Sequence, residues 1–206
     1  MIFQIGSLYV ITAAHCVEKD EAANVRIETE VQDTRNPDDR RTYKVESILV
    51  YPDYSVLKNP GEGLSIDHDI ALIKLQNPVT STNFAQPINL SDDENISGTT
   101  GILVGWGADG YIGWGSEGSY TYELNKAEMP IQSNEDCMEM LNTVGKKKYK
   151  NGRIFHIQKG HLCAGHHHGG IDGCQVSYSN CSWLQCPKCM TFPLFCQVLV
   201  MPNIFF

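Results

Sequence analysis

A histidine that lies directly before a cysteine, at the end of an apolar stretch, is the first residue of this chain with the chemistry of a general base. His15 and Cys16 end the stretch Thr-Ala-Ala-His-Cys at residues 12–16, which follows the apolar residues 8–11. An apolar run of this kind predicts a strand, and a strand end holds an imidazole in the fixed position that a general base requires. A core histidine beside a buried cysteine is the alternative interpretation.

An aspartate before a second apolar stretch supplies a partner for this histidine. Asp69 directly precedes residues 70–75, whose alternation of side chains predicts a strand. A carboxylate drawn into an apolar setting is costly unless it is paired. A histidine is a suitable partner, because the carboxylate fixes its tautomer and stabilises the imidazolium. A turn or strand-capping aspartate is the alternative interpretation.

The elements that must position these residues are short strands divided by turns, which predicts an all-β chain. Residues 45–50 alternate as a strand should, and a proline turn follows at residues 51–54. A helix is expected to begin near Ser133, because a serine or asparagine can cap it and acidic residues follow. The three lysines at residues 146–148 predict a solvated loop, with a binding exosite as the alternative.

The composition is that of a globular protein from an oxidising compartment. The chain has 206 residues, of which 42% are hydrophobic and 8 are cysteines, and its formal net charge is −8. This cysteine content is typical of secreted proteins, and the negative charge argues against a nucleic-acid partner. We expect no membrane span, because no apolar run is long enough, and no signal peptide within the chain.

Five motifs, in order along the chain, resemble the chymotrypsin/trypsin family of serine endopeptidases. Besides the two motifs above, they are Gly-Ile-Leu-Val-Gly-Trp-Gly at residues 101–107, Leu-Cys-Ala-Gly at 162–165 and Asp-Gly-Cys-Gln at 172–175. The resemblance implies two six-stranded antiparallel β-barrels with the site in the cleft between them. The first barrel is expected in residues 1–90, the second in residues 91–175, and an unrelated cysteine-rich apolar tail in residues 176–206.

The same resemblance implies roles for three residues. His15 is the general base, Asp69 is its orienting partner, and Asp172 is the floor of the primary specificity pocket. An aspartate at that position selects Arg or Lys by charge-assisted pairing, whereas a plain loop aspartate is the alternative. The implied function is cleavage of protein or peptide substrates after Arg or Lys in the extracellular space, with protease inhibitors as further partners and no cofactor.

The chain departs from the family at the nucleophile. The family continues Asp-Gly-Cys-Gln with Gly-Asp-Ser-Gly-Gly-Pro, whereas here Gln175 is followed by Val-Ser-Tyr-Ser, so Tyr178 takes the position of the serine. Ser177 and Ser179 flank that position, and the glycines that let the backbone form an oxyanion hole are missing. We therefore expect this chain to be catalytically inactive.

Both ends of the chain depart from the family as well. An Ile-Val-Gly-Gly start is missing, so we expect both barrels to be incomplete and both Cys16 and Cys174 to lack their usual partners. Gln-Val-Ser at residues 175–177 also translates CAG followed by a common exon–intron donor sequence, and the tail is therefore a candidate retained intron. Two alternatives stay open: a non-catalytic homologue that binds substrates or inhibitors as a decoy, and a mis-spliced product with no function.

The remaining cysteines and histidines give one disulfide and two weak metal motifs. The resemblance implies a disulfide between Cys137 and Cys163. The three histidines at residues 166–168 have the chemistry to bind transition metals weakly, but they equally fit a solvated loop. Four tail cysteines have the ligand type for zinc, although only one pair has metal-like spacing, and we expect no metal; they are Cys181, Cys186, Cys189 and Cys196.

Overall fold

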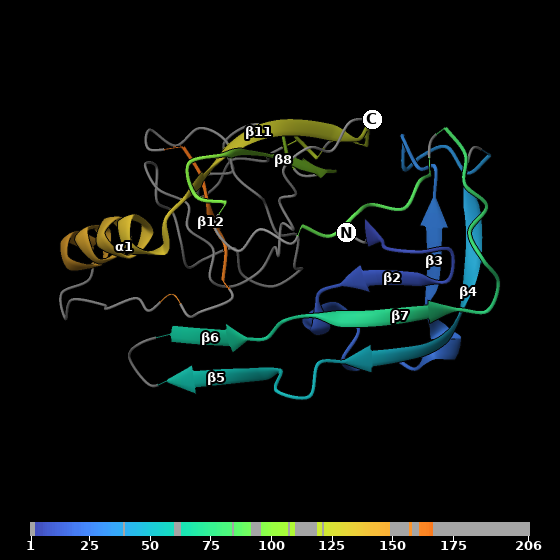
Figure 1. Ribbon diagram of the computed structural model, residues 1–206, viewed down its shortest axis with the longest axis horizontal. Coiled ribbons are helices and arrows are strands. Elements are labelled where there is room, and N and C mark those ends of the chain that lie inside the picture. The colour runs from blue at the N-terminus through green and yellow to red at the C-terminus, as the bar shows by residue number, and fades with distance from the viewer. Residues whose placement is uncertain are drawn as a thin grey trace.

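In the part of the chain that the computed structural model describes, antiparallel strands make up most of the regular structure, and one long helix accompanies them (Figure 1). The structure describes residues 3–38, 40–59, 63–83, 85–91, 96–106, 108–109, 119–120, 122–148, 157 and 161–166. The strands are β1 (Phe3–Gln4), β2 (Tyr9–Thr12), β3 (Arg26–Thr29), β4 (Arg41–Val50), β5 (Ser55–Asn59), β6 (Gly63–Asp67), β7 (Ala71–Leu75), β8 (Thr100–Gly105), β9 (Ala108–Asp109), β10 (Ser119–Tyr120), β11 (Asn125–Gln132) and β12 (Cys163–Ala164). The helices are the 3-10 turns η1 (Ala14–Cys16) and η2 (Ala22–Asn24) and the α-helix α1 (Asn134–Lys148). The expected all-β fold is confirmed.

A curled five-stranded sheet forms the N-terminal half, in the order β1-β2-β7-β4-β3. Every pairing in this sheet is antiparallel. The long strand β4 pairs with β3 at its start and with β7 at its end, and a β-bulge between Val45 and Ser47 interrupts the register near the start of the pairing with β7. A bulge bends a strand and increases its twist. The bend in β4 therefore fits the curl of the sheet, in which this one strand pairs with β3 and with β7 (Figure 1).

The core of this half lies under β7. This strand alternates fully buried and half-buried residues, as its sequence predicts, with Ala71, Ile73 and Leu75 on the buried side. Val10 of β2 pairs directly with Ile73, and both are almost fully buried. The same cluster of buried residues includes Ala14 of η1, so the turn that follows β2 is anchored in the core.

A second sheet in the order β12-β11-β8 belongs to the C-terminal half, and α1 follows β11 (Figure 1). The predicted cap is confirmed: the backbone N–H of Asp136 donates to Ser133 Oγ at 3.0 Å, and Ser133 Oγ donates to the Asp136 carboxylate at 2.7 Å. The disulfide between Cys137 and Cys163, also expected, joins α1 to β12 across 26 residues of sequence. The division of the chain at residue 90 stays a prediction.

One expectation about this half is wrong. Residues 146–148 belong to the last turn of α1 rather than to a loop. Lysine is a good helix former, and a cationic residue near the C-terminus of a helix is favoured by the helix dipole. The lysines therefore continue the helix, even though Gly145 directly precedes them.

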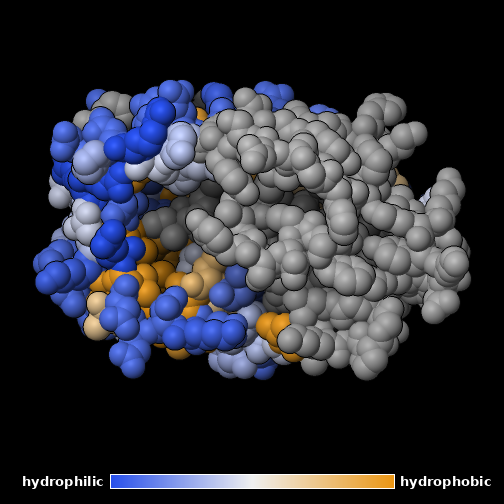
Figure 2. Space-filling model, turned by 180° about the vertical axis from the view of Figure 1, so that it is seen from behind, coloured by the Kyte–Doolittle hydropathy of each residue, from blue (hydrophilic) through white to orange (hydrophobic). Residues whose placement is uncertain are grey.

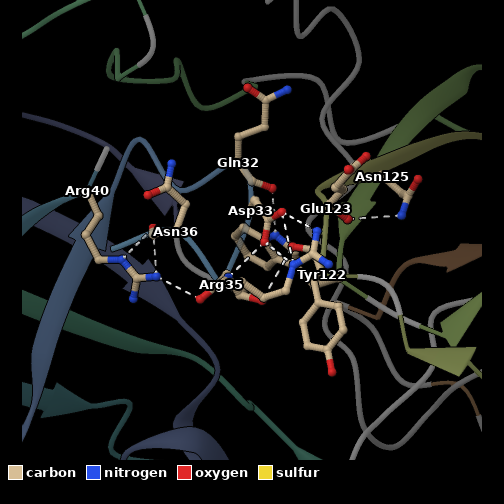
Figure 3. A network of polar contacts seen from close by, with 10 residues as sticks. Gln32, Asp33, Arg35, Asn36, Arg40, Tyr122, Glu123 and Asn125 are labelled. Carbon is tan, nitrogen blue, oxygen red and sulfur yellow. Dashed lines mark hydrogen bonds and ion pairs between the residues drawn. The ribbon is translucent and has the colours of Figure 1, made fainter. Parts of the chain in front are cut away.

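A polar clasp joins the two halves (Figure 3). We use this name for residues 32–36, between β3 and β4, together with residues 122–124, which precede β11. Thr34 N donates to the carbonyl of Tyr122 at 2.9 Å, and Leu124 N donates to the carbonyl of Gln32 at 2.7 Å. The Arg35 guanidinium lies 4.7 Å from the ring centroid of Tyr122, a cation–π distance. The halves are thus joined by a short ladder of backbone bonds and one ring contact.

The surface is mainly hydrophilic over the part of the chain that Figure 2 colours, and hydrophobic residues gather in one hollowed area of that face. Leu49 on β4 is the most exposed large hydrophobic residue among those described, at 64% exposed. None of the helices among the described residues has the length and apolar character to cross a membrane.

Two leucines on paired strands test where the core lies. Leu75→Ala removes a side chain that is 0% exposed, and we expect it to lower the free energy of unfolding by about 2–5 kcal/mol. Leu49→Ala makes the same chemical change at a site that is 64% exposed, and we expect a change within about 0.5 kcal/mol. Urea unfolding with the disulfide intact measures both values, and equal losses would contradict the assignment of the core to β7.

Candidate active site

The register of two strands brings the predicted histidine and aspartate together. Thr12, the last residue of β2, pairs with Ala71, the first residue of β7. Since the strands are antiparallel, the chain leaving β2 and the chain entering β7 meet at the same edge of the sheet. His15 comes three residues after Thr12 and Asp69 two residues before Ala71, so both side chains lie at this edge.

The Asp69 carboxylate makes two hydrogen bonds with His15. Its Oδ1 accepts from the backbone N–H of His15 at 2.8 Å, and its Oδ2 accepts from Nδ1 of the ring at 2.6 Å. Asp69 is only 6% exposed, so both bonds form in a partly desolvated setting where charge-assisted contacts are strong. Because a carboxylate oxygen can only accept, this contact places a proton on Nδ1 and leaves Nε2 on the opposite side of the ring.

The chain reaches this position through a left-handed residue. His68 has a φ of 51°, which is uncommon for a residue with a side chain, although histidine is among the types found there more often. The backbone N–H of Ile70 donates to the carbonyl of His68 at 2.7 Å, which makes a tight turn centred on Asp69. The ring of His68 stacks on Tyr51 with the centroids 5.2 Å apart.

Hydrogen bonds with Asp69 and Cys16 favour the protonated form of the His15 ring. The hydrogen bond with Asp69 is the largest cause, the hydrogen bond with Cys16 adds to it, and burial opposes both; together they raise the pKa of His15 from 6.5 to about 10. His15 is therefore an imidazolium at neutral pH. An imidazolium can donate a proton, but it must lose one before it acts as a general base.

The outer nitrogen of His15 faces the neighbouring thiol. Cys16 Sγ lies 3.4 Å from His15 Nε2, and Cys16 is exposed and carries a free thiol. The hydrogen bond with His15 lowers the pKa of this thiol, against the opposing effects of burial and of the Asp69 charge. Burial raises the pKa of the nearby Tyr54 hydroxyl to about 12, and the charges of Glu18 and Asp69 add to this effect. Tyr54 therefore stays neutral at neutral pH.

Asp67, two residues before Asp69, has two histidine side chains near its carboxylate. The Asp67 Oδ1 atom is 3.4 Å from Nδ1 of His68 and 3.7 Å from Nε2 of His161, so it contacts one residue from each half of the chain. Asp67 and His68 directly precede Asp69 in the sequence. No signal in the sequence relates His161 to them, because the contact depends on how the two halves pack.

The other predicted site residues lie in part outside the described residues. Asp172, Cys174, Ser177, Tyr178, Ser179 and the tail cysteines all do so. His166 is described, and its Nε2 donates to the carbonyl of Glu128 on β11 at 3.0 Å. Among the residues that the structure describes, no group of three or more His, Cys, Asp or Glu side chains is placed to hold a metal ion.

The contact between Cys16 and His15 was missed by sequence reasoning. The resemblance to the family predicts only that Cys16 lacks its usual disulfide partner, and it does not place the thiol beside the ring. Side chains of adjacent residues usually diverge, and only the 3-10 turn η1 brings this thiol to Nε2. The turn itself had no sequence signal in the stretch Thr-Ala-Ala-His-Cys.

Comparisons with known proteins agree with this geometry. A family model described as Trypsin matches residues 3–176. The chain is 31% identical to the venom serine protease Bi-VSP of Bombus ignitus over 195 residues, which cover 91% of the chain and 48% of the relative. It is 33% identical over 189 residues to the CLIP domain-containing serine protease B10 of Anopheles gambiae, covering 82% of the chain and 46% of the relative.

A vertebrate protein is also similar. The chain is 28% identical over 175 residues to coagulation factor IX of Oryctolagus cuniculus, covering 83% of the chain and 55% of the relative. The chain thus spans about half the length of each of these three relatives. The stretch matched by the family model includes His15, Asp69 and Asp172.

Replacing the carboxylate tests the cause of the raised pKa. In Asp69→Asn the amide can still accept from the backbone N–H of His15 but carries no charge, so we expect the pKa of His15 to fall from about 10 toward 6.5. Titration of the histidine ring signals by NMR measures this value, with His15→Gln to assign the signal. Asp67→Asn is the matched control and leaves the pKa of His15 unchanged. An unchanged value in Asp69→Asn would refute the assignment.

Proposed function

Because the chain belongs to the trypsin family of serine proteases, we propose that it derives from an endopeptidase that cleaves protein substrates after Arg or Lys. His15 is its general base and Asp69 holds the imidazole in the productive tautomer. The observation that carries the proposal is the 2.6 Å hydrogen bond from His15 Nδ1 to Asp69 Oδ2, which leaves Nε2 on the opposite side of the ring, 3.4 Å from Cys16 Sγ. This is the arrangement in which a carboxylate orients a histidine to take a proton from a nucleophile.

Asp172 supplies the specificity in this proposal. It lies two residues before Cys174 in the matched stretch, where a family member places the floor of its primary pocket. A carboxylate at the bottom of an otherwise apolar pocket pairs with a guanidinium or ammonium group and leaves other side chains unpaired. The negative charge of the chain favours the approach of such basic segments.

The 206-residue chain itself is proposed to be catalytically inactive. Tyr178 takes the position of the serine, and Val176 and Ser177 replace residues of the Gly-Asp-Ser-Gly-Gly-Pro motif. Loss of a nucleophile and of an oxyanion hole each costs orders of magnitude in rate.

An extracellular location is the last part of the proposal. The disulfide between Cys137 and Cys163 requires an oxidising compartment to form and persist. One of the relatives is a venom protease by name, and its similarity covers most of the chain. The partners that follow from this location are protein substrates and protease inhibitors.

The inactivity of the chain has a direct test. We expect residues 1–206, expressed with the disulfide formed, to release no product from an Arg-ending amide substrate above the rate of His15→Ala. A fluorophosphonate probe, which labels activated serines, is expected to leave Ser177 and Ser179 unmodified. Turnover that disappears in His15→Ala, or labelling of either serine, would show that the chain is active. Tight binding of a protease inhibitor without turnover would favour a decoy role instead.

A chimaera tests the proposed specificity. We replace residues 1–4 and 176–206 by the corresponding flanks of the Bombus ignitus relative and measure cleavage of peptides that end in Arg, Lys or Leu. The chimaera is expected to cleave after Arg and Lys, and His15→Ala within it to lose all activity. Asp172→Ser is expected to lower kcat/KM for Arg and Lys peptides by at least about a hundredfold, since a buried charged pair is lost. An unchanged preference in Asp172→Ser would refute the role of Asp172.

A further inference from the structure

An acceptor sequence for N-linked glycosylation lies in the segment between β7 and β8. Asn89, Leu90 and Ser91 form the tripeptide Asn-X-Ser, in which X is not proline. An asparagine in such a tripeptide is expected in a surface loop of a secreted protein, where it accepts an oligosaccharide. Because the tripeptide also arises by chance, the surroundings of the asparagine decide whether a glycan fits there.

The tripeptide is open to solvent along its whole length. Asn89, Leu90 and Ser91 are all exposed, and Leu90, between the acceptor and the serine, is 52% exposed. A glycan is bulky and hydrophilic, so it is compatible with a fold only where its asparagine lies at the surface. The exposure of three consecutive residues leaves room for a glycan on Asn89.

The backbone around the acceptor is irregular. Residues 85–91 belong to no helix and no strand, so the hydrogen-bond ladder of a sheet does not include them. Connecting segments of this kind carry a large share of the functional and modified positions of proteins, because they lie at the surface and tolerate additions. The segment thus has the loop structure that the tripeptide predicts.

Contacts before the tripeptide fix where the acceptor lies. Ile88 N donates to the carbonyl of Gln4 on β1 at 2.8 Å, and Ala85 belongs to the buried core of the N-terminal half. The segment therefore passes beside the N-terminal end of the chain (Figure 1). Ile88 is half-buried whereas Asn89 is exposed, so burial ends at the residue where the tripeptide begins.

We propose that Asn89 is an acceptor site for an N-linked oligosaccharide, with Ser91 as the hydroxyl residue of the acceptor sequence. The proposal rests on the extracellular location proposed above, because the sugar donor is found in the secretory pathway. It does not require any peptidase activity. Two further tripeptides of this type, at Asn95 and Asn180, begin outside the described residues.

The transfer balances with one co-substrate, an oligosaccharide that is linked through a diphosphate to a membrane lipid. The Nδ2 atom of Asn89 forms a new bond to C1 of the first sugar. The bond between C1 and the diphosphate oxygen breaks, and its electron pair leaves with the lipid diphosphate. The amide gives up one of its two protons. The products are therefore the glycosylated asparagine, the lipid diphosphate and a proton, and nothing is oxidised or reduced.

Site-specific mass spectrometry tests the proposal. The 206-residue chain is expressed in insect cells behind a cleavable secretion leader, and protein from the medium and from the cell membranes is analysed. A peptide N-glycosidase in water labelled with heavy oxygen converts a glycosylated asparagine into a labelled aspartate. A glutamate-specific protease cuts after Glu94 and so separates Asn89 from Asn95. We expect the label at Asn89, and no label there in the same chain made without a leader.

Variants separate the acceptor sequence from the surrounding surface. Asn89→Gln removes the acceptor and Ser91→Ala removes the hydroxyl, and we expect each to lower the intact mass by one glycan. Ser91→Thr keeps the hydroxyl and is expected to keep the glycan. Asn83→Gln is the matched control and leaves the mass of the glycans unchanged, because Asn83 is exposed in the same segment but is followed by Phe84 and Ala85.

Two results would overturn the proposal. The first is a chain from the medium or the membranes whose Asn89 carries no label, which needs no variant to establish. The second is a label that persists in Ser91→Ala, because deamidation rather than a glycan then explains it. Analysis of the membranes gives an answer even where the chain folds too poorly to be secreted. The result is independent of the peptidase assays, so this proposal and the proposed function fail separately.

Discussion

The pairing of a buried carboxylate with a histidine is the constraint around which the N-terminal half is arranged. Asp69 is 6% exposed, and a carboxylate at that depth destabilises the fold unless its charge is matched. His15 satisfies both oxygens, one through its backbone and one through its ring. The residues next to this pair, Ala14 and Ala71, belong to the buried core, so the position of the pair and the packing of the sheet are determined together.

The Cys16 thiol lies beside the His15 ring, on the side away from Asp69. In a serine protease the outer nitrogen of the histidine serves a hydroxyl, which is a poor acid and leaves the ring neutral at rest. A thiol is a much stronger acid, and here Cys16 faces that nitrogen at 3.4 Å. The ring of His15 thus lies between the Asp69 carboxylate and the Cys16 thiol. Both contacts raise the pKa of His15 and so favour the protonated ring.

Several elements in both halves could be predicted from the sequence because their signals are local. The alternation in residues 70–75 gave β7, the proline turn gave the break after β4, and Ser133 gave the start of α1. Features that depend on contacts between distant segments had no such signal. The clasp between residues 32–36 and 122–124 consists mostly of backbone bonds, which leave no trace in residue type. The contact of His161 with Asp67 likewise exists only once both halves are packed.

The disulfide between Cys137 and Cys163 affects how the chain responds to a break in its backbone. The bridge encloses the rest of α1 and the segment that leads to β12. A proteolytic nick at any peptide bond between the two cysteines produces two fragments that stay covalently joined. Such a nicked chain keeps its mass on a non-reducing gel and separates only after reduction. The C-terminal half can therefore be cut within this stretch without the release of β12 from the sheet that it borders.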